Sequence, residues 1–163
     1  PKVKLYLNDK LIGEKETGKE NYTATFDVPY EPGTLKAVNS KGKEEFVLKT
    51  AGEPAAIRLI ADRSKIKACK NDLSYVKIEL VDKNGNVVPE TSLPVKIECT
   101  GKGTVIAGGN AAYADMESFR SLTPNTFRGK AIAIVQPDGE KGDIQVKVSA
   151  KGLEDASIVI TTY

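Results

Sequence analysis

Two pairs of carboxylates have the residue type and spacing that acid–base chemistry requires. Asp115 and Glu117 lie two positions apart in a long stretch without strand pattern, and Asp138 and Glu140 flank Gly139. Paired carboxylates on either side of a glycosidic bond carry out glycoside hydrolysis. Carboxylates in the turns of β-proteins are mostly solvated, however, and nothing around these pairs predicts a cleft or a raised pKa. We therefore predict that the chain has no catalytic residue.

The rarity of metal-binding residues argues against a metal or cofactor site. Histidine, the commonest metal ligand and acid–base residue, is absent, and there are two cysteines, Cys69 and Cys99. Two cysteines without histidine cannot complete a structural zinc site. Cys69 lies in a polar turn and Cys99 on the inward side of a predicted strand, so we expect two unpaired thiols. The alternative, a disulfide, requires Cα atoms within ~7 Å.

The aromatic residues define one candidate contact surface, because β-sandwiches bind sugars through exposed rings with polar neighbours. Most of the usable rings lie in the long segment 108–128. We expect Phe119 and Phe127 to turn inward and hold this segment in order on the sandwich, with help from the side chains of Asn110 and Ser118. The predicted contact surface then consists of Asn110, Tyr113, Asp115 and Glu117. Carbohydrate is the ligand class that this surface suggests.

The central strand of the chain is predicted by strict alternation. Val76, Ile78 and Leu80 alternate with charged residues, the period of a strand with one buried face. The segment Asp82-Lys83-Asn84-Gly85-Asn86 follows, and Asn-Gly predicts a hairpin with a type I′ turn. Similar patterns recur at 57–61, 95–99, 104–107, 130–136, 143–150 and 156–162. We predict that one core between two sheets contains Ile78, Leu80, Ile97, Val146 and Val148.

Residues 1–50 read as about five shorter strands, one of them at 22–28, with a turn at Lys41-Gly42-Lys43. Ala51-Gly52-Glu53-Pro54 has the glycine and proline of a linker. No stretch of ten or more residues has a helical period. The predicted fold class is all-β, with two tandem antiparallel immunoglobulin-like β-sandwiches. The domains are 1–51, which is small and which we expect to be incomplete at its N-terminus, and 55–163.

Charge and hydropathy argue against nucleic acid and membranes as partners. Lys and Arg total 24 against 22 Asp and Glu, a formal net charge of +2. This balance gives no electrostatic reason to expect nucleic acid. No apolar run approaches the ~18 residues of a membrane helix. The first residues lack the basic and apolar regions of a signal peptide, and we expect the chain to be a piece of a longer protein. We also expect no membrane insertion.

Two family resemblances rest on motifs spread along the whole chain. Residues 55–163 resemble bacterial immunoglobulin-like domains of the invasin and intimin type, through Ala56-Ile-Arg-Leu-Ile-Ala-Asp62, the hairpin and Gly142-Asp-Ile-Gln-Val-Lys-Val-Ser-Ala-Lys-Gly152. The entire chain is similar to the C-terminal region of glycoside hydrolase family 2 enzymes, chiefly β-galactosidases of Gram-negative gut bacteria. The motifs are Val3-Lys-Leu-Tyr-Leu-Asn-Asp-Lys-Leu-Ile-Gly13, Val28-Pro-Tyr-Glu-Pro-Gly-Thr-Leu-Lys-Ala-Val38, Lys49-Thr-Ala-Gly-Glu-Pro54, Gly109-Asn110, Glu117-Ser-Phe119 and Phe127-Arg-Gly129.

The second resemblance implies a non-catalytic accessory region of a periplasmic or extracellular glycosidase. The catalytic glutamates of that family lie on a (β/α)₈ barrel, to which no part of this chain corresponds. The implied partner is the rest of the glycosidase, and the implied roles are bracing the barrel, lining its entrance or supporting a dimer contact. A carbohydrate-binding module and an adhesin-type spacer remain alternatives.

Overall fold

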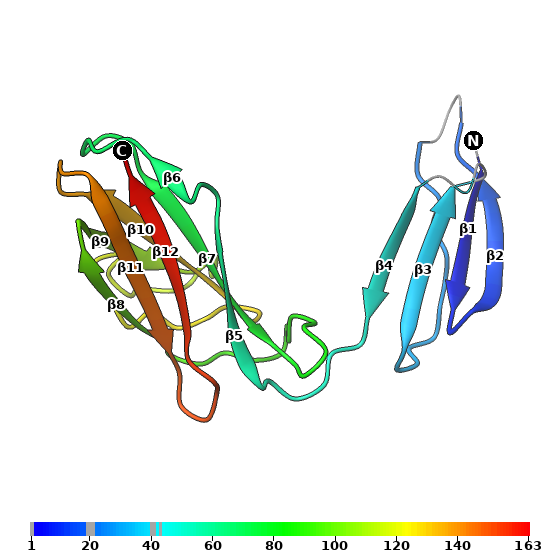
Figure 1. Cartoon of the computed structure of the whole chain (residues 1–163). Helices are drawn as coiled ribbons and strands as arrows, with labels where there is room; N and C mark the ends of the chain where they lie inside the picture. Colours follow the sequence, from blue (N-terminus) through cyan, green and yellow to red (C-terminus); the bar gives the residue numbers. More distant parts are fainter. Residues whose placement is uncertain (1, 19–21, 40–41, 43) are drawn as a thin grey trace. The chain divides into compact units, whose positions relative to one another are not determined.

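The computed structural model describes residues 2–18, 22–39, 42 and 44–163 (Figure 1). They form two compact units, Pro1–Thr50 and Ala51–Tyr163. Every element of the described residues is a β-strand, which confirms the all-β prediction. Those same residues contain no helix long and apolar enough to cross a membrane.

The first unit contains one antiparallel sheet in the order β2-β1-β3-β4. The strands are β1 (Lys2–Leu7), β2 (Lys10–Glu16), β3 (Thr34–Asn39) and β4 (Glu45–Lys49). Alternation along β1 places Leu5 and Leu7 in the buried layer, 8% and 7% exposed. The expected turn at Lys41-Gly42-Lys43 lies mostly outside the described residues.

The fifth strand expected in this unit is not formed, because the segment 22–28 joins no ladder among the described residues. The expected half-buried face of this segment is formed by Ala24, Phe26 and Val28, with exposed residues between them, whereas Tyr22, expected on the same face, is 87% exposed. The Phe26 ring lies against Gly13 of β2, and the Lys15 ammonium lies 5.3 Å from the centre of that ring. The segment therefore contacts the sheet through side chains rather than through a backbone ladder.

The second unit is a sandwich of two four-stranded sheets, β5-β7-β10-β9 and β6-β12-β11-β8, which face each other in Figure 1. Its strands are β5 (Ala56–Ala61), β6 (Lys65–Ile66), β7 (Ser74–Val81), β8 (Lys96–Gly101), β9 (Gly103–Gly109), β10 (Lys130–Pro137), β11 (Gly142–Ser149) and β12 (Ala156–Thr162). All the ladders are antiparallel except the short parallel pairing of β12 with β6.

The core between these sheets matches the prediction from alternation. Ile78 and Leu80 of one sheet, and Ile97, Val146 and Val148 of the other, belong to one buried cluster in which none is more than 2% exposed. Burial of this kind of side chain contributes roughly 1.5–3 kcal/mol each. The stably packed sandwich therefore fixes the positions at which its loops begin and end.

The hairpin after β7 differs from the predicted type I′ turn. Among the residues of the turn, Gly85 has a positive φ of 78°, whereas Asn84 does not. The Gly85 N–H donates to the Asp82 carbonyl oxygen at 3.0 Å, and the Asp82 N–H donates to the Asn86 carbonyl at 2.9 Å. This is the longer hairpin in which an ordinary turn is followed by one left-handed glycine. Asp82 favours this turn over type I′, because its carboxylate accepts hydrogen bonds from the backbone N–H groups of Asn84 and Asn86.

Candidate functional site

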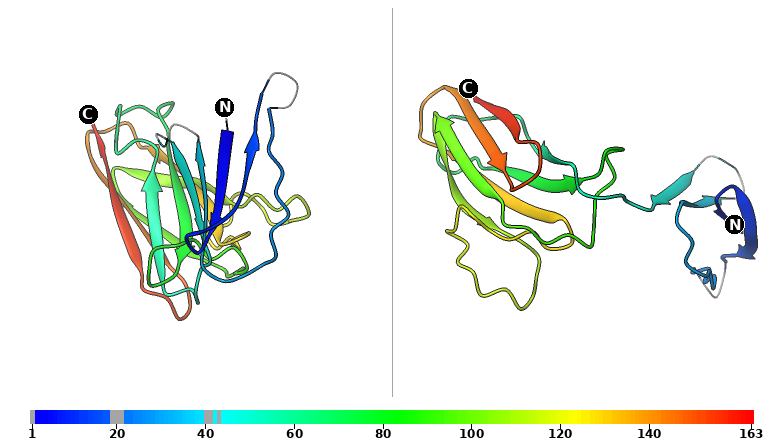
Figure 2. Two further views of the ribbon diagram at one scale, coloured as in Figure 1. Left: turned by 90° about the vertical axis from the view of Figure 1, so that its right-hand side faces the viewer. Right: turned by 90° about the horizontal axis from the view of Figure 1, so that it is seen from below.

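The segment between β9 and β10 closes the gap between two sheet edges. β9 is the last strand of one sheet and β8 the last strand of the other, so both have unpaired backbone groups. The Gly108 N–H donates to the Phe119 carbonyl at 2.7 Å. On β8, the Ile97 N–H donates to the Leu122 carbonyl at 2.8 Å. The segment, yellow-green where it projects from the sandwich in the right-hand view of Figure 2, is thus held by backbone hydrogen bonds to both sheets.

Thr126 anchors the far end of this segment. Its side chain is 1% exposed and sits beside Leu93, whose N–H donates to the Thr126 hydroxyl oxygen at 2.9 Å. The same hydroxyl donates to the Leu93 carbonyl at 3.2 Å, and the Ser92 hydroxyl donates to the Thr126 carbonyl at 2.7 Å. A buried hydroxyl that both donates and accepts is fully satisfied, so this contact stabilises the order of the segment.

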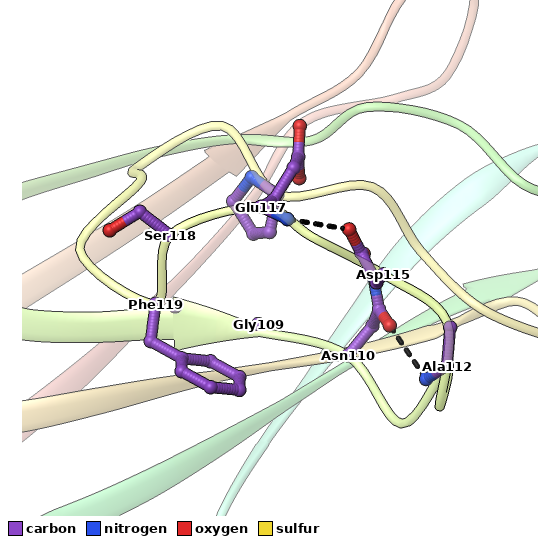
Figure 3. Close-up of a pocket in the computed structure, with 9 residues that line it drawn as sticks. Gly109, Asn110, Ala112, Asp115, Glu117, Ser118 and Phe119 are labelled. Carbon is purple, nitrogen blue, oxygen red and sulfur yellow. Dashed lines mark hydrogen bonds between the residues drawn. The ribbon is translucent and has the colours of Figure 1, made fainter.

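The tip of the segment is organised by Asn110, as Figure 3 shows. Its amide nitrogen donates to the Asp115 carboxylate and to the Asn125 carbonyl, the latter at 2.9 Å, and its amide oxygen accepts the Ala112 N–H at 2.7 Å. Asp115 in turn accepts the Glu117 N–H at 2.9 Å. Asn110 is half-buried and ties the start of the tip to its end. Of the two side chains expected to supply hydrogen bonds, Asn110 is the central one, and Ser118 accepts the Arg120 N–H at 3.2 Å.

Three of the four residues predicted to form a contact surface therefore lie together. Glu117 accepts hydrogen bonds from the Asn125 N–H at 3.2 Å and from the Asn125 amide at 3.4 Å. Asp115 and Glu117 are exposed at the surface while Asn110 lies beneath them. Tyr113 is fully exposed and is separate from this network.

The predicted inward position of Phe119 is wrong. Its side chain is 70% exposed, and its ring lies against Gly109, where an added Cβ would come within 2.8 Å of the ring. Phe127 is half-buried, with the Arg128 guanidinium 5.5 Å from the centre of its ring. Backbone pairing to β8 and β9 already orders the segment, so its stability does not require Phe119 in the core.

A small hollow lies beside Phe119 (Figure 3). It is lined by Gly108, Gly109, Asn110, Ala112, Asp115, Glu117, Ser118, Phe119 and Pro124. The Glu117 N–H, followed by the Asn110 amide, lowers the pKa of Asp115 below its ordinary value. A carboxylate stabilised in its charged form is a poor proton donor at neutral pH. The arrangement therefore supports recognition of a surface or a polar ligand better than acid–base chemistry.

The second carboxylate pair also has structural partners. Asp138 accepts the Glu140 N–H at 2.9 Å, and the Glu140 carboxylate forms an ion pair with Lys102. That carboxylate raises the pKa of Lys102. Among the described residues no group of three or more acidic or cysteine side chains could hold a metal ion. Both cysteines are free thiols, Cys69 exposed and Cys99 half-buried.

The carboxylate with the largest resolved perturbation is Asp82, which the carboxylate analysis of the sequence missed. It is 4% exposed, and its pKa is lowered to about 2, first by the Gly52 N–H and then by the Asn86 and Asn84 groups. The Gly52 N–H donates to it at 2.9 Å. The spacing Asp-x-Asn-x-Asn could have indicated a carboxylate that gathers neighbouring N–H groups. Its partners make it a structural residue of the hairpin.

Family models match both units of the chain. "Glycoside hydrolase family 2 C-terminal domain 5" matches residues 57–159. "Domain of unknown function (DUF4982)" matches residues 1–46. The first of these matches covers most of the second unit, including the whole segment between β9 and β10.

The similar proteins are named as glycosidases. The chain is 33% identical over 98% of its length to the β-galactosidase BoGH2A of Bacteroides ovatus, of which it covers 19%. A glycosyl hydrolase family 2 member from Bacteroides cellulosilyticus superposes with a TM-score of 0.89 at 37% identity, over 98% of this chain and 23% of that one. A β-glycosidase from Bacteroides vulgatus gives 0.88 at 26% identity, over 99% and 21%. The chain thus spans about a fifth of the length of these relatives.

Proposed function

The chain belongs to the glycoside hydrolase family 2 C-terminal domain 5 family, and we propose that it is a non-catalytic accessory region that braces the catalytic part of such a glycosidase. The observation that carries the proposal is the difference in coverage: 98% of this chain aligns with 19% of a β-galactosidase. The rest of the relative's length has room for the catalytic machinery. The carboxylate pairs of this chain, by contrast, already serve as hydrogen-bond acceptors or ion-pair partners within it.

The tip of the segment 108–128 is the part of this region that we assign to bracing. A loop that contacts another domain works best when its shape exists before contact, because ordering each residue on binding costs roughly 1–2 kcal/mol. Here Asn110 and Thr126 hold the tip in one shape from two ends. Tyr113 and Met116 then stand out with exposures of 101% and 95%. Large apolar side chains held in this way are typical of contact surfaces.

The experiment replaces Tyr113 by alanine in the full-length glycosidase and measures its thermal midpoint, kcat and KM. We expect a lowered midpoint with kcat and KM unchanged, since the ring stabilises the contact with the catalytic part. Tyr22→Ala is the matched control, because Tyr22 is also a highly exposed tyrosine, at 87%, but belongs to the first unit.

Carbohydrate contact by the same tip is the second candidate, favoured by the full exposure of Tyr113 in the loop that also exposes the carboxylates of Asp115 and Glu117. It predicts the opposite pattern: Tyr113→Ala and Glu117→Ala raise KM while the thermal midpoint stays the same. An unchanged midpoint together with unchanged kinetic constants would contradict both roles of the tip.

A further inference from the structure

An apolar row crosses the outer face of the β5-β7-β10-β9 sheet. In the ladder, Ile60 lies opposite Lys77, and Lys77 opposite Ile132. Ile60 is 40% exposed and Ile132 38% exposed, and Tyr75, two residues before Lys77 on the same strand face, is 42% exposed. Large aliphatic and aromatic side chains on a solvent-facing sheet surface are unusual when they are neighbours.

Phe119 extends this row to the sheet edge. Gly109 is the ladder partner of Ile132, so both positions face the same side of the sheet. A side chain at Gly109 would start 2.8 Å from the Cδ1 atom of Phe119. The ring of Phe119 therefore occupies the place of the side chain that Gly109 lacks, next to Ile132. Its exposed position, unexpected from the sequence, makes sense as part of this surface.

Charged residues border the row at one end. The Lys77 ammonium lies 3.2 Å from one Glu79 oxygen, and the Arg58 guanidinium lies 2.6 Å from the other. The head of Lys77 is thus drawn along the strand toward Glu79, which leaves its aliphatic stem between Ile60 and Ile132. An apolar centre with a charged border is the composition of a protein–protein interface.

We propose that this surface, which consists of Ile60, Tyr75, Phe119 and Ile132, docks the remainder of the same polypeptide. The proposal rests on the proposed function in one respect, namely that the chain is part of a larger glycosidase. The chain covers 19% of the β-galactosidase relative, so 81% (100 − 19) of that relative lies outside the matched region. A sugar is a poorer occupant, because Ile60, Phe119 and Ile132 offer no hydrogen-bonding group and the Lys77 ammonium is already paired with Glu79.

The test measures thiol labelling in the full-length protein with its natural accessible cysteines changed to serine. One variant carries Ile132→Cys. The control carries Val159→Cys, since Val159 of β12 is 47% exposed on the outer face of the opposite sheet. We expect a maleimide to label position 132 at least about tenfold more slowly than position 159, because a docked side chain reacts only when the interface opens. Phe119→Cys, at the other end of the row, should be protected in the same way.

Two results would overturn the docking proposal. Equal labelling of positions 132 and 159 in the native protein, with unchanged thermal midpoints and equal labelling after unfolding, would overturn the docking proposal. Protection that disappears on dilution would also overturn it, because a second copy would then be the occupant. Neither result touches the non-catalytic role, which fails only if the chain itself hydrolyses glycosides.

Discussion

Asp82 accepts four hydrogen bonds, from the backbone N–H groups of Gly52, Asn84 and Asn86 and from the Asn86 amide. It joins the hairpin after β7 to the segment that leads into β5. A carboxylate surrounded by N–H donors is stabilised in its charged form, which is the reason for its pKa of about 2. Asp82 therefore contributes to the pH dependence of the stability of the second unit.

The first prediction concerns acid unfolding. The pKa of Asp82 is about 2 in the folded chain and about 4 in an unfolded one, so its contribution is complete above about pH 4 and is lost as the pH falls toward 2. Asp82→Asn should lower the stability at pH 7 and flatten the loss between pH 4 and 2 in urea unfolding. The exposed Glu90→Gln is the control and should leave the profile unchanged. A wild-type slope in the Asp82→Asn protein would contradict the assignment.

The second prediction concerns the two thiols. Cys69 is exposed, whereas Cys99 is half-buried, and burial raises the pKa of the Cys99 thiol. Because the thiolate is the reactive form, a thiol reagent at neutral pH should label Cys69 quickly and Cys99 slowly. Both should react at once after unfolding without a reductant. Finding no reactive thiol in that unfolded sample would instead establish a disulfide.

At the residue scale, the sequence predicts which side of a strand a residue faces, but not where an aromatic side chain of a long loop lies. Alternation assigned Ile78, Leu80 and Ile97 to the core correctly, because the side of a strand is a local property. The position of Phe119 was assigned wrongly, because it depends on Gly109 and on the edge of β9, more than eight positions away. Aromatic side chains in long loops follow such distant contacts rather than their neighbours in sequence.

At the scale of elements, the segment between β9 and β10 owes its order to the edges it covers. Its carbonyls accept N–H groups from Val95, Ile97 and Gly108, which would otherwise be unpaired. Covering exposed strand edges also protects a sandwich from edge-to-edge association. The presence of a long loop could be read from the sequence, but its path could not, because backbone hydrogen bonds leave no pattern in side-chain types.

The third prediction tests this anchoring through Thr126→Val. Valine keeps the shape of threonine but leaves the Leu93 N–H, which faces the buried Thr126 side chain, without an acceptor, a loss of about 1–3 kcal/mol in the free energy of unfolding. Urea titration measures that loss, and limited proteolysis should show faster cleavage within 111–121. Thr123→Val, at an exposed position of the same segment, should change neither. Unaltered stability in the Thr126 variant would mean that the segment is held elsewhere.

The fourth prediction concerns the packing of β7 against the opposite sheet. Ile78 is fully buried between the sheets, so Ile78→Ala should reduce the free energy of unfolding by about 2–5 kcal/mol. Val159→Ala, which removes an aliphatic side chain from an outer sheet face, should cost about 0.5–1 kcal/mol. Similar losses in the two variants would show that the strand faces were assigned the wrong way round.

At the scale of the whole molecule, the chain consists of two β-units, and each has its own match to a family model. The all-β class could be predicted because turns and period-2 patterns recur throughout. The first unit was harder, since its segment 22–28 has strand-like alternation without a ladder partner among the described residues. Pro29 and Pro32, close behind that segment, remove backbone donors that an extension of a ladder would need.

The proposed function assigns catalysis to the part of the glycosidase outside these two units. Under this proposal the chain contributes contacts and stability, while the remainder of the protein contributes the reacting groups. Loss of the chain should then affect the thermal midpoint of the enzyme more than the chemistry of each turnover.

The most direct measurement is hydrolysis of chromogenic β-galactoside and β-glucuronide substrates by the chain alone, beside the full-length protein. We predict background release of chromophore from the chain and turnover of at least one substrate by the full-length protein. Release of chromophore by the chain that a single change such as Asp115→Asn or Glu117→Gln abolishes would contradict the non-catalytic role.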